Sequence, residues 1–261
     1  MELVTPATPQ DAQALADRLG ARARFIAGGT LLQQEWDEPR LAPPGLCFIN
    51  VQAWPETQRI ALGEAHLRIG AGARLETVRT HALVLAHAPL LSEALGQLGA
   101  LGVRRLGTLG GNVGWGMGDS APVLLALDAE AELADGTREP LERTLLRPVR
   151  PLMVAFHLPR ADARRPVHAV FEKVGYRAAF SPGRLRLALR WRDAARGRAV
   201  VRAAAGAPGV SAVRLHAVEA LLAEPGPRPG LAAVRGACLR ALPPPLALIA
   251  SRLIAGHCGL L

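Results

Sequence analysis

Two glycine-rich turns, about eighty residues apart, constrain this chain more than any other feature of its sequence. The first is Phe25-Ile-Ala-Gly-Gly-Thr30 and the second is Thr108-Leu-Gly-Gly-Asn112. Glycine lets the main chain adopt positive φ and approach a ligand closely, and successive N–H groups in such turns form a concavity that binds anions. Either turn alone is more commonly an ordinary chain reversal. Together they predict an extended, doubly charged ligand that is held from both sides.

Length and composition favour a globular protein with one large domain or two smaller ones. The 261 residues are about half apolar, which is enough for a sizeable core. The longest apolar runs, 121–127 and 246–250, are much shorter than the roughly 20 residues of a membrane span. Glu2 and Asp11 stand where a signal peptide is basic and then apolar, and the three cysteines are scattered. We therefore expect a cytoplasmic protein with no disulfide framework, metal site or iron–sulfur cluster of its own.

The net charge of +9 comes from the C-terminal half of the chain. Residues 1–130 carry 10 basic and 13 acidic side chains, whereas residues 131–261 carry 21 basic and 9 acidic ones. Almost all of the excess is arginine, because Lys173 is the only lysine. Nucleic-acid binding is one alternative, but aromatic residues make up only 4% of the chain and single-strand binding uses aromatic platforms. A solvated or subunit-facing basic surface is the favoured interpretation.

The spacing of apolar residues predicts an α/β opening, a mixed middle, and a C-terminal series of strands followed by helices. Thr8 is expected to cap the first helix, which Gly20 ends. A charged, proline-bounded linker is expected near residues 160–166. The expected helices are 9–19, 90–101, one from Asp119 or Ser120 to 127, and the tail from 216 onwards. The expected strands are 23–27, 46–51, 60–62, 67–69, 131–134, 152–158, 169–176, 185–191, 199–204 and 211–215.

The two turns do not match the commoner phosphate-binding motifs. A P-loop needs Gly-Lys-Ser/Thr, whereas the second turn continues as Asn112-Val-Gly114. Gly70-Ala-Gly72 follows a strand but lacks the third glycine of the Rossmann fingerprint. The seven histidines show neither metal-ligand spacing nor a nearby nucleophile. Any chemistry is therefore expected to come from a bound cofactor.

Further motifs follow the second turn and complete a recognisable set. Gly118-Asp-Ser-Ala-Pro122 and Leu124-Leu-Ala-Leu-Asp128, together with the turns, resemble the FAD-binding medium subunit of molybdenum hydroxylases. This family includes the xanthine dehydrogenase and carbon monoxide dehydrogenase flavoprotein subunits. The likeness continues in Phe171-Glu-Lys-Val-Gly175 and in Ala204-Ala-Gly-Ala-Pro208, so it spans most of the chain.

The resemblance implies an α+β fold with two domains. The first, residues 1–160, is a PCMH-type FAD-binding domain with a small α/β lobe (1–55) and an α+β lobe (56–160). The second, residues 167–261, has antiparallel strands and a helical bundle. FAD is expected to lie extended between the two lobes of the first domain.

The resemblance also implies which residues hold FAD. Both turns should cradle the pyrophosphate, and Asp119 should bind the adenosine ribose. Met153 should pack near the flavin, and Lys173 should reach the cofactor from the C-terminal domain. The implied cofactor-binding residues are Ala27, Gly28, Gly29, Thr30, Leu31, Thr108, Gly110, Gly111, Asn112, Asp119, Met153 and Lys173. No side chain is implied as catalytic or as a metal ligand.

Two departures from the family pattern bear on this site. Leu31 stands where the family usually has an acid. The segment between Asn112 and Asp119 is about two residues shorter than usual and reads Val-Gly-Trp-Gly-Met-Gly. Because that segment lies near the flavin in the family, Trp115 either stacks on the ring or fills the space of the missing residues.

The resemblance implies an electron-transfer role within a larger complex. Substrate is oxidised at a molybdenum cofactor in a large partner subunit. Electrons then pass through [2Fe–2S] centres in a small partner to FAD in this chain, and on to NAD or another acceptor. The arginine-rich half is expected to dock an acidic partner or to attract NAD. The alternatives are a structural subunit that has lost flavin and, less favoured, a basic nucleic-acid-binding protein.

Overall fold

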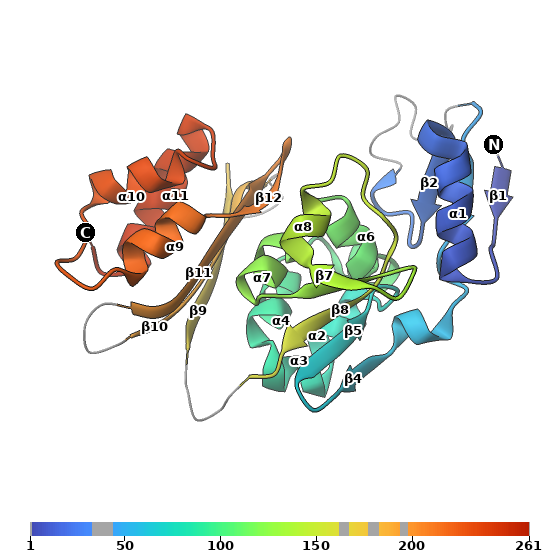
Figure 1. Cartoon of the computed structure of the whole chain (residues 1–261), viewed down its shortest axis with the longest axis horizontal. Coiled ribbons are helices and arrows are strands. Elements are labelled where there is room, and N and C mark those ends of the chain that lie inside the picture. The colour runs from blue at the N-terminus through green and yellow to red at the C-terminus, as the bar shows by residue number, and fades with distance from the viewer. Residues whose placement is uncertain (1, 33–43, 162–166, 177–182, 194–197, 261) are drawn as a thin grey trace. The chain divides into compact units, whose positions relative to one another are not determined.

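The computed structural model describes residues 2–32, 44–161, 167–176, 183–193 and 198–260 (Figure 1). The chain forms two compact units. The first contains residues 1–115 and 129–160, and the second contains residues 116–128 and 161–261. The chain therefore leaves the first unit after Trp115 and returns to it at Ala129. Among the described residues, none of the helices is both long enough and apolar enough to pass through a bilayer.

The first unit begins with a small parallel sheet and one helix. In sheet order the strands are β1 (Glu2–Val4), β3 (Cys47–Asn50) and β2 (Ala23–Ile26). Helix α1 (Pro9–Leu19) connects β1 to β2, and its cap Thr8 accepts a hydrogen bond from the Asp11 N–H at 3.1 Å. One face of α1 packs against Ile49 and Trp54 in a shared apolar core. The predicted α/β opening is confirmed, with β1 as an added strand.

The rest of the first unit is an antiparallel sheet with short helices. In sheet order the strands are β4 (Ile60–Leu62), β5 (His66–Gly70), β8 (Met153–Pro159), β6 (Glu130–Leu133) and β7 (Arg138–Pro140). The helices are α2 (Leu75–Thr80), α3 (Ala82–His87), α4 (Pro89–Gly96), α5 (Leu101–Leu106), α6 (Leu109–Gly114) and α8 (Leu141–Leu145). The helix predicted over 90–101 is present as α4, but its predicted end was wrong. Helix α4 ends at Gly96, and α5 begins at Leu101 after Gly99, which has a φ of +50°.

The second unit is a four-stranded antiparallel sheet with helices on one face (Figure 1). In sheet order the strands are β12 (Val210–Arg214), β11 (Arg198–Ala207), β10 (Gly183–Asp193) and β9 (His168–Gly175). The helices are α9 (His216–Ala223), α10 (Leu231–Cys238) and α11 (Pro244–His257). Alternate residues of β10, namely Leu185, Leu187 and Leu189, pack into the core against these helices. The predicted antiparallel strands and helical tail are confirmed.

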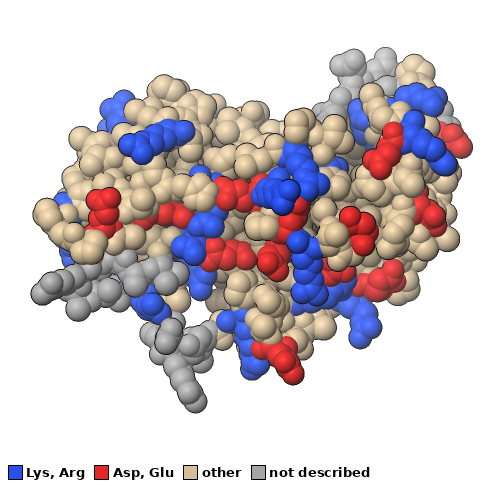
Figure 2. All heavy atoms as spheres, in the orientation of Figure 1, with Lys and Arg blue, Asp and Glu red and all other residues tan. Residues whose placement is uncertain are grey.

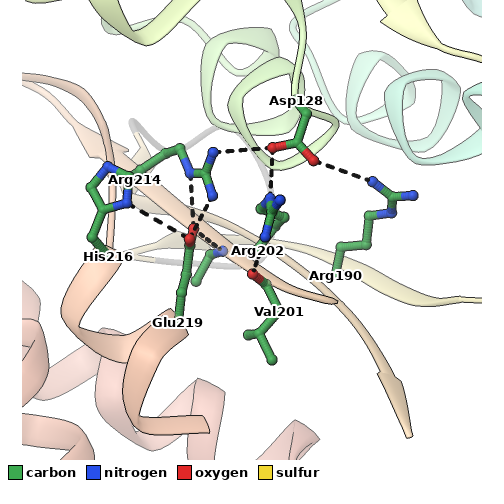
Figure 3. Close-up of polar contacts among 8 residues, drawn as sticks. Asp128, Arg190, Val201, Arg202, Arg214, His216 and Glu219 are labelled. Atoms are coloured by element: carbon green, nitrogen blue, oxygen red, sulfur yellow. Dashed lines mark hydrogen bonds and ion pairs between the residues drawn. The ribbon is translucent and has the colours of Figure 1, made fainter. Parts of the chain in front are cut away.

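The opposite face of this sheet carries basic side chains and receives helix α7 (Ser120–Ala126), which packs on β10, β11 and β12. Asp128, just after α7, accepts hydrogen bonds from Arg202 Nε at 2.6 Å and Arg214 Nη1 at 3.0 Å (Figure 3). Arg190 lies 3.9 Å from the same carboxylate. Asp128 holds a positive φ of 54°, a conformation that Asp and Asn tolerate better than most residues. These ion pairs explain why the segment 116–128 belongs to the second unit.

Candidate cofactor site

Both glycine-rich turns line one cavity of about 420 Å³ in the first unit. This volume lies within the range of small-molecule binding sites, roughly 300–1,000 Å³. Ten of the twelve predicted cofactor residues line it: Ala27, Gly28, Gly29, Thr30, Leu31, Thr108, Gly110, Gly111, Asn112 and Met153. The fold thus brings the two turns, which are far apart in the sequence, to the same cavity.

The first turn directly follows β2 and presents its backbone to the cavity. Gly29 has a φ of +68°, and a side chain there would meet no atom within 4 Å. Gly28 is required for a different reason, because a Cβ there would overlap the carbonyl of Leu106. Within the described part of the chain, the N–H groups of Gly28 and Gly29 have no hydrogen-bond acceptor. The first turn therefore has donors available for an anion.

The second turn differs, because its N–H groups are already used. It forms the start of α6, where the Thr108 hydroxyl accepts from the Gly111 N–H at 3.1 Å and the Thr108 carbonyl accepts from the Asn112 N–H at 3.0 Å. The Gly110 N–H donates to the Ala71 carbonyl at 2.7 Å, and a Cβ on Gly110 would lie 2.8 Å from that of Ala71. The two turns are similar in sequence but differ in their free N–H groups. In the structure the second contributes shape and polar side chains rather than free backbone donors.

Two polar residues that the sequence analysis did not single out connect the turns. Gln52 Nε2 donates to the Ala27 carbonyl in the first turn. Arg74 Nη2 donates to Gln52 Oε1 at 2.8 Å, and Arg74 Nη1 donates to the Leu106 carbonyl, just before the second turn. This bridge spans the two turns with side-chain hydrogen bonds. Neither residue lies in a recognisable motif, so no sequence signal identifies them.

The ionisable residues that line the cavity, among those described, are basic. Arg24 and Arg150 contribute to its wall, and no described aspartate or glutamate does. Arg150 Nη1 donates to the Gly114 carbonyl at 3.1 Å, and Nη2 donates to the Leu145 carbonyl at 3.4 Å. Burial lowers the pKa of Arg150, but a guanidinium remains protonated in proteins. A cavity with this lining suits an anionic ligand such as a diphosphate.

The remaining two predicted residues, Asp119 and Lys173, belong to the second unit and contact each other. Asp119 is 4% exposed, and its carboxylate accepts from Lys173 Nζ at 2.6 Å and from Arg186 Nε. Arg186 on β10 lies opposite Lys173 on β9 in the sheet register, which brings the two cations to one carboxylate. Arg186 is a further residue that sequence reasoning missed, since the pairing of the two strands is not visible in the sequence.

The structure is a two-unit α+β protein whose first unit contains a cavity lined by both glycine turns. A sequence profile of the family described as "FAD binding domain in molybdopterin dehydrogenase" matches residues 1–148, more than half of the chain. The chain therefore belongs to this family. The resemblance that the motifs indicated is confirmed, and FAD is the cofactor of this family's domain.

Individual relatives agree with this assignment. The nicotinate dehydrogenase FAD-subunit of Eubacterium barkeri is 29% identical over 147 residues, which cover 53% of this chain. The match spans about half (48%) of that relative's length. A structure of carbon monoxide dehydrogenase from Hydrogenophaga pseudoflava, in a form lacking the Mo-pyranopterin moiety of the molybdenum cofactor, matches with a TM-score of 0.77 and 24% identity. That match covers 98% of this chain and 93% of the other.

A second enzyme shares the fold. The structure of quinoline 2-oxidoreductase from Pseudomonas putida 86 matches with a TM-score of 0.75 and 20% identity, covering 98% of this chain and 94% of the other. At these identities the structural likeness shows the fold. The predicted α+β architecture, an FAD-binding domain followed by strands and a helical bundle, is confirmed.

Proposed function

We propose that this chain is the electron-transfer subunit of a molybdenum hydroxylase complex. In this role it accepts electrons from [2Fe–2S] centres of a small partner and passes them to NAD or another acceptor. Substrate is oxidised at the molybdenum cofactor of a large partner. The observation that carries the proposal is the cavity lined by both glycine turns, with two arginines and no described acid in its wall.

The residues present fit a bound dinucleotide. FAD exchanges electrons singly or in pairs, which lets it connect one-electron centres to a two-electron acceptor. The N–H groups of Gly28 and Gly29 are placed to donate to the diphosphate, and the arginines of the wall complement its charge. Leu31 lines the same cavity and contributes apolar surface to it.

Asp119 and Lys173 are proposed as further cofactor contacts, as the family resemblance implies. A carboxylate has about four acceptor sites, so the hydrogen bonds from Lys173 and Arg186 leave Asp119 able to accept from ribose hydroxyls. We therefore assign the ribose to Asp119 and a supporting position beside the cofactor to Lys173.

Titration of the purified chain with FAD tests the proposal. We expect saturable binding of one equivalent and the visible absorption bands of oxidised flavin. A protein that neither retains flavin on purification nor binds added FAD would refute the proposal and favour a structural subunit. Anaerobic addition of NADH then tests the acceptor, because an NAD-linked subunit should lose its visible flavin absorption. Co-purification with a molybdenum subunit and an iron–sulfur subunit tests the partners.

A further inference from the structure

Three tryptophans lie in the described residues, and Trp115 differs from the other two in the surroundings of its indole ring. Trp54 is 4% exposed, belongs to the apolar core beside α1, and donates from Nε1 to the Pro6 carbonyl at 3.2 Å. Trp191 is 9% exposed, lies in the core of the second unit, and stacks on His168 with ring centroids 5.2 Å apart. Both are core residues with a partner for the ring or its N–H group.

Trp115 has neither kind of partner. It is half-buried and lines the cavity, and within the described residues its indole makes no hydrogen bond and no ring contact. A large aromatic ring usually gains stability by full burial, and a buried indole N–H usually finds an acceptor. An indole left at the wall of a ligand cavity is instead typical of a stacking surface.

The backbone of Trp115 is nevertheless held in place. Its N–H donates to the Gly111 carbonyl at 3.3 Å, and its own carbonyl accepts from Arg150 Nη1 at 3.4 Å. The preceding Gly114 lies against Met153, since a Cβ there would be 3.8 Å from the Met153 methyl. The backbone that carries the ring is therefore held by hydrogen bonds, and Trp115, Arg150 and Met153 line the same cavity.

We propose that Trp115 stacks on the isoalloxazine ring of FAD and that Arg150 positions it. The inference rests on the proposed function. A cavity wall that carries an electron-rich indole and a guanidinium suits an electron-poor ring with carbonyl groups. Isoalloxazine has both properties, whereas adenine has no carbonyl group. Trp115 thus serves as a cofactor contact rather than as filler for the shortened segment before Asp119.

Fluorescence of the bound flavin and two ligand affinities test this assignment in the full chain. The variants are Trp115→Leu, which removes the aromatic surface, and Trp115→Phe, which keeps a flat but less electron-rich ring. Trp191→Phe is the matched control, because it removes a tryptophan that does not line the cavity. The ligands are FAD and ADP, which has the diphosphate and adenosine but no isoalloxazine.

Wild-type protein should strongly quench the fluorescence of bound FAD. Trp115→Leu should restore that fluorescence several-fold and weaken FAD binding by about tenfold or more, the usual effect of losing one stacking partner. Its affinity for ADP should not change. Trp115→Phe should also restore fluorescence while keeping near-wild-type FAD affinity, and it serves as the reference if the Leu variant does not fold. Trp191→Phe should behave as wild type.

Two outcomes would overturn the assignment. Unchanged flavin fluorescence and FAD affinity in Trp115→Leu would make Trp115 a space-filling residue. An equal loss of ADP affinity would mean that the indole contacts adenine or only holds the turn. Failure of the proposed function itself would be seen earlier, because wild-type protein would then bind no FAD.

Discussion

Gly29→Ala provides the sharpest test of the diphosphate site, because the structure separates its effect on folding from its effect on binding. Gly29 has a φ of +68°, and an added Cβ would meet no protein atom within 4 Å. Gly136, in the turn between β6 and β7, has a φ of +85° and an equally open Cβ position, but it does not line the cavity. Gly136→Ala is therefore a matched control in the same unit.

Both substitutions should cost a similar amount of stability. An L-residue in the left-handed region costs roughly 1–2 kcal/mol, and neither position adds a clash. At about 2–4 °C per kcal/mol for a chain of this size, each variant should lower the Tm of the FAD-free protein by a few degrees. Binding should respond only in Gly29→Ala, where the new methyl group occupies space at the exposed N–H groups. Crowding at a close contact costs roughly 1–3 kcal/mol, or about five- to 150-fold in Kd.

Thermal melts without FAD and FAD titrations of both variants provide the measurements. Equal melting temperatures with a raised Kd in Gly29→Ala alone would support the assignment. Two other results would contradict it. A Kd that stays at the wild-type value in both variants would place the diphosphate elsewhere, and a Kd raised equally in both would mean that backbone strain acts on binding from a distance.

Four further measurements address the rest of the structure. Asp128→Asn should lower the free energy of unfolding by about 2–3 kcal/mol in denaturant titrations. The carboxylate accepts two hydrogen bonds from arginines, each of which contributes roughly 1.5–3 kcal/mol, and its 29% exposure to solvent reduces their sum. Two arginine partners hold the pKa of Glu76 at about 2 rather than 4.5, so Glu76→Gln should lower Tm at neutral pH, and this deficit should disappear as pH falls towards 2. Burial lowers the pKa of His157, so the unfolded chain takes up its proton first; stability should fall as pH drops through 6.5, and less steeply in His157→Gln. Burial raises the pKa of the Cys238 thiol to about 12, so mass spectrometry should detect alkylation only in denaturant.

The strands and long helices could be predicted because their apolar spacing is local. Alternating residues of β10 face the helices, and this pattern is visible along a single stretch of chain. The short helices α2, α3, α5 and α8 were not predicted, since five or six residues are too few for a helical period to stand out. The second turn was interpreted as an isolated turn, although Thr108 carries the capping chemistry that starts α6.

The site shows the same division between local and long-range information. The glycine motifs predicted which backbone segments line the cavity, and ten of twelve residues do so. The side chains that connect those segments could not be predicted, because Gln52 and Arg74 act across separations that only the folded sheet sets. The sequence also does not separate the roles of Gly28 and Gly29. A side chain on Gly28 would overlap the Leu106 carbonyl, so Gly29 is the better probe of the ligand.

Some of the basic side chains of the C-terminal half form ion pairs that hold helix α7, a role that the net charge does not indicate. Five basic residues lie on the sheet face that receives α7: Lys173, Arg186, Arg190, Arg202 and Arg214. Their acidic partners, Asp119 and Asp128, stand directly before and just after α7, so the helix is held at both ends by ion pairs. Figure 2 also shows basic and acidic side chains mixed on the visible surface rather than gathered by sign.

This arrangement changes what the arginines imply about partners. Five of the basic side chains pair with the two aspartates of the 116–128 segment. The C-terminal half therefore attracts nucleic acid less strongly than its composition indicates. It also ties the proposed ribose-binding Asp119 to the same face that fixes Asp128. A variant that loosens the Asp128 end of α7 is therefore expected to weaken FAD binding through the Asp119 end. The Asp128→Asn protein should then show a raised Kd for FAD, although Asp128 itself lines no part of the cavity.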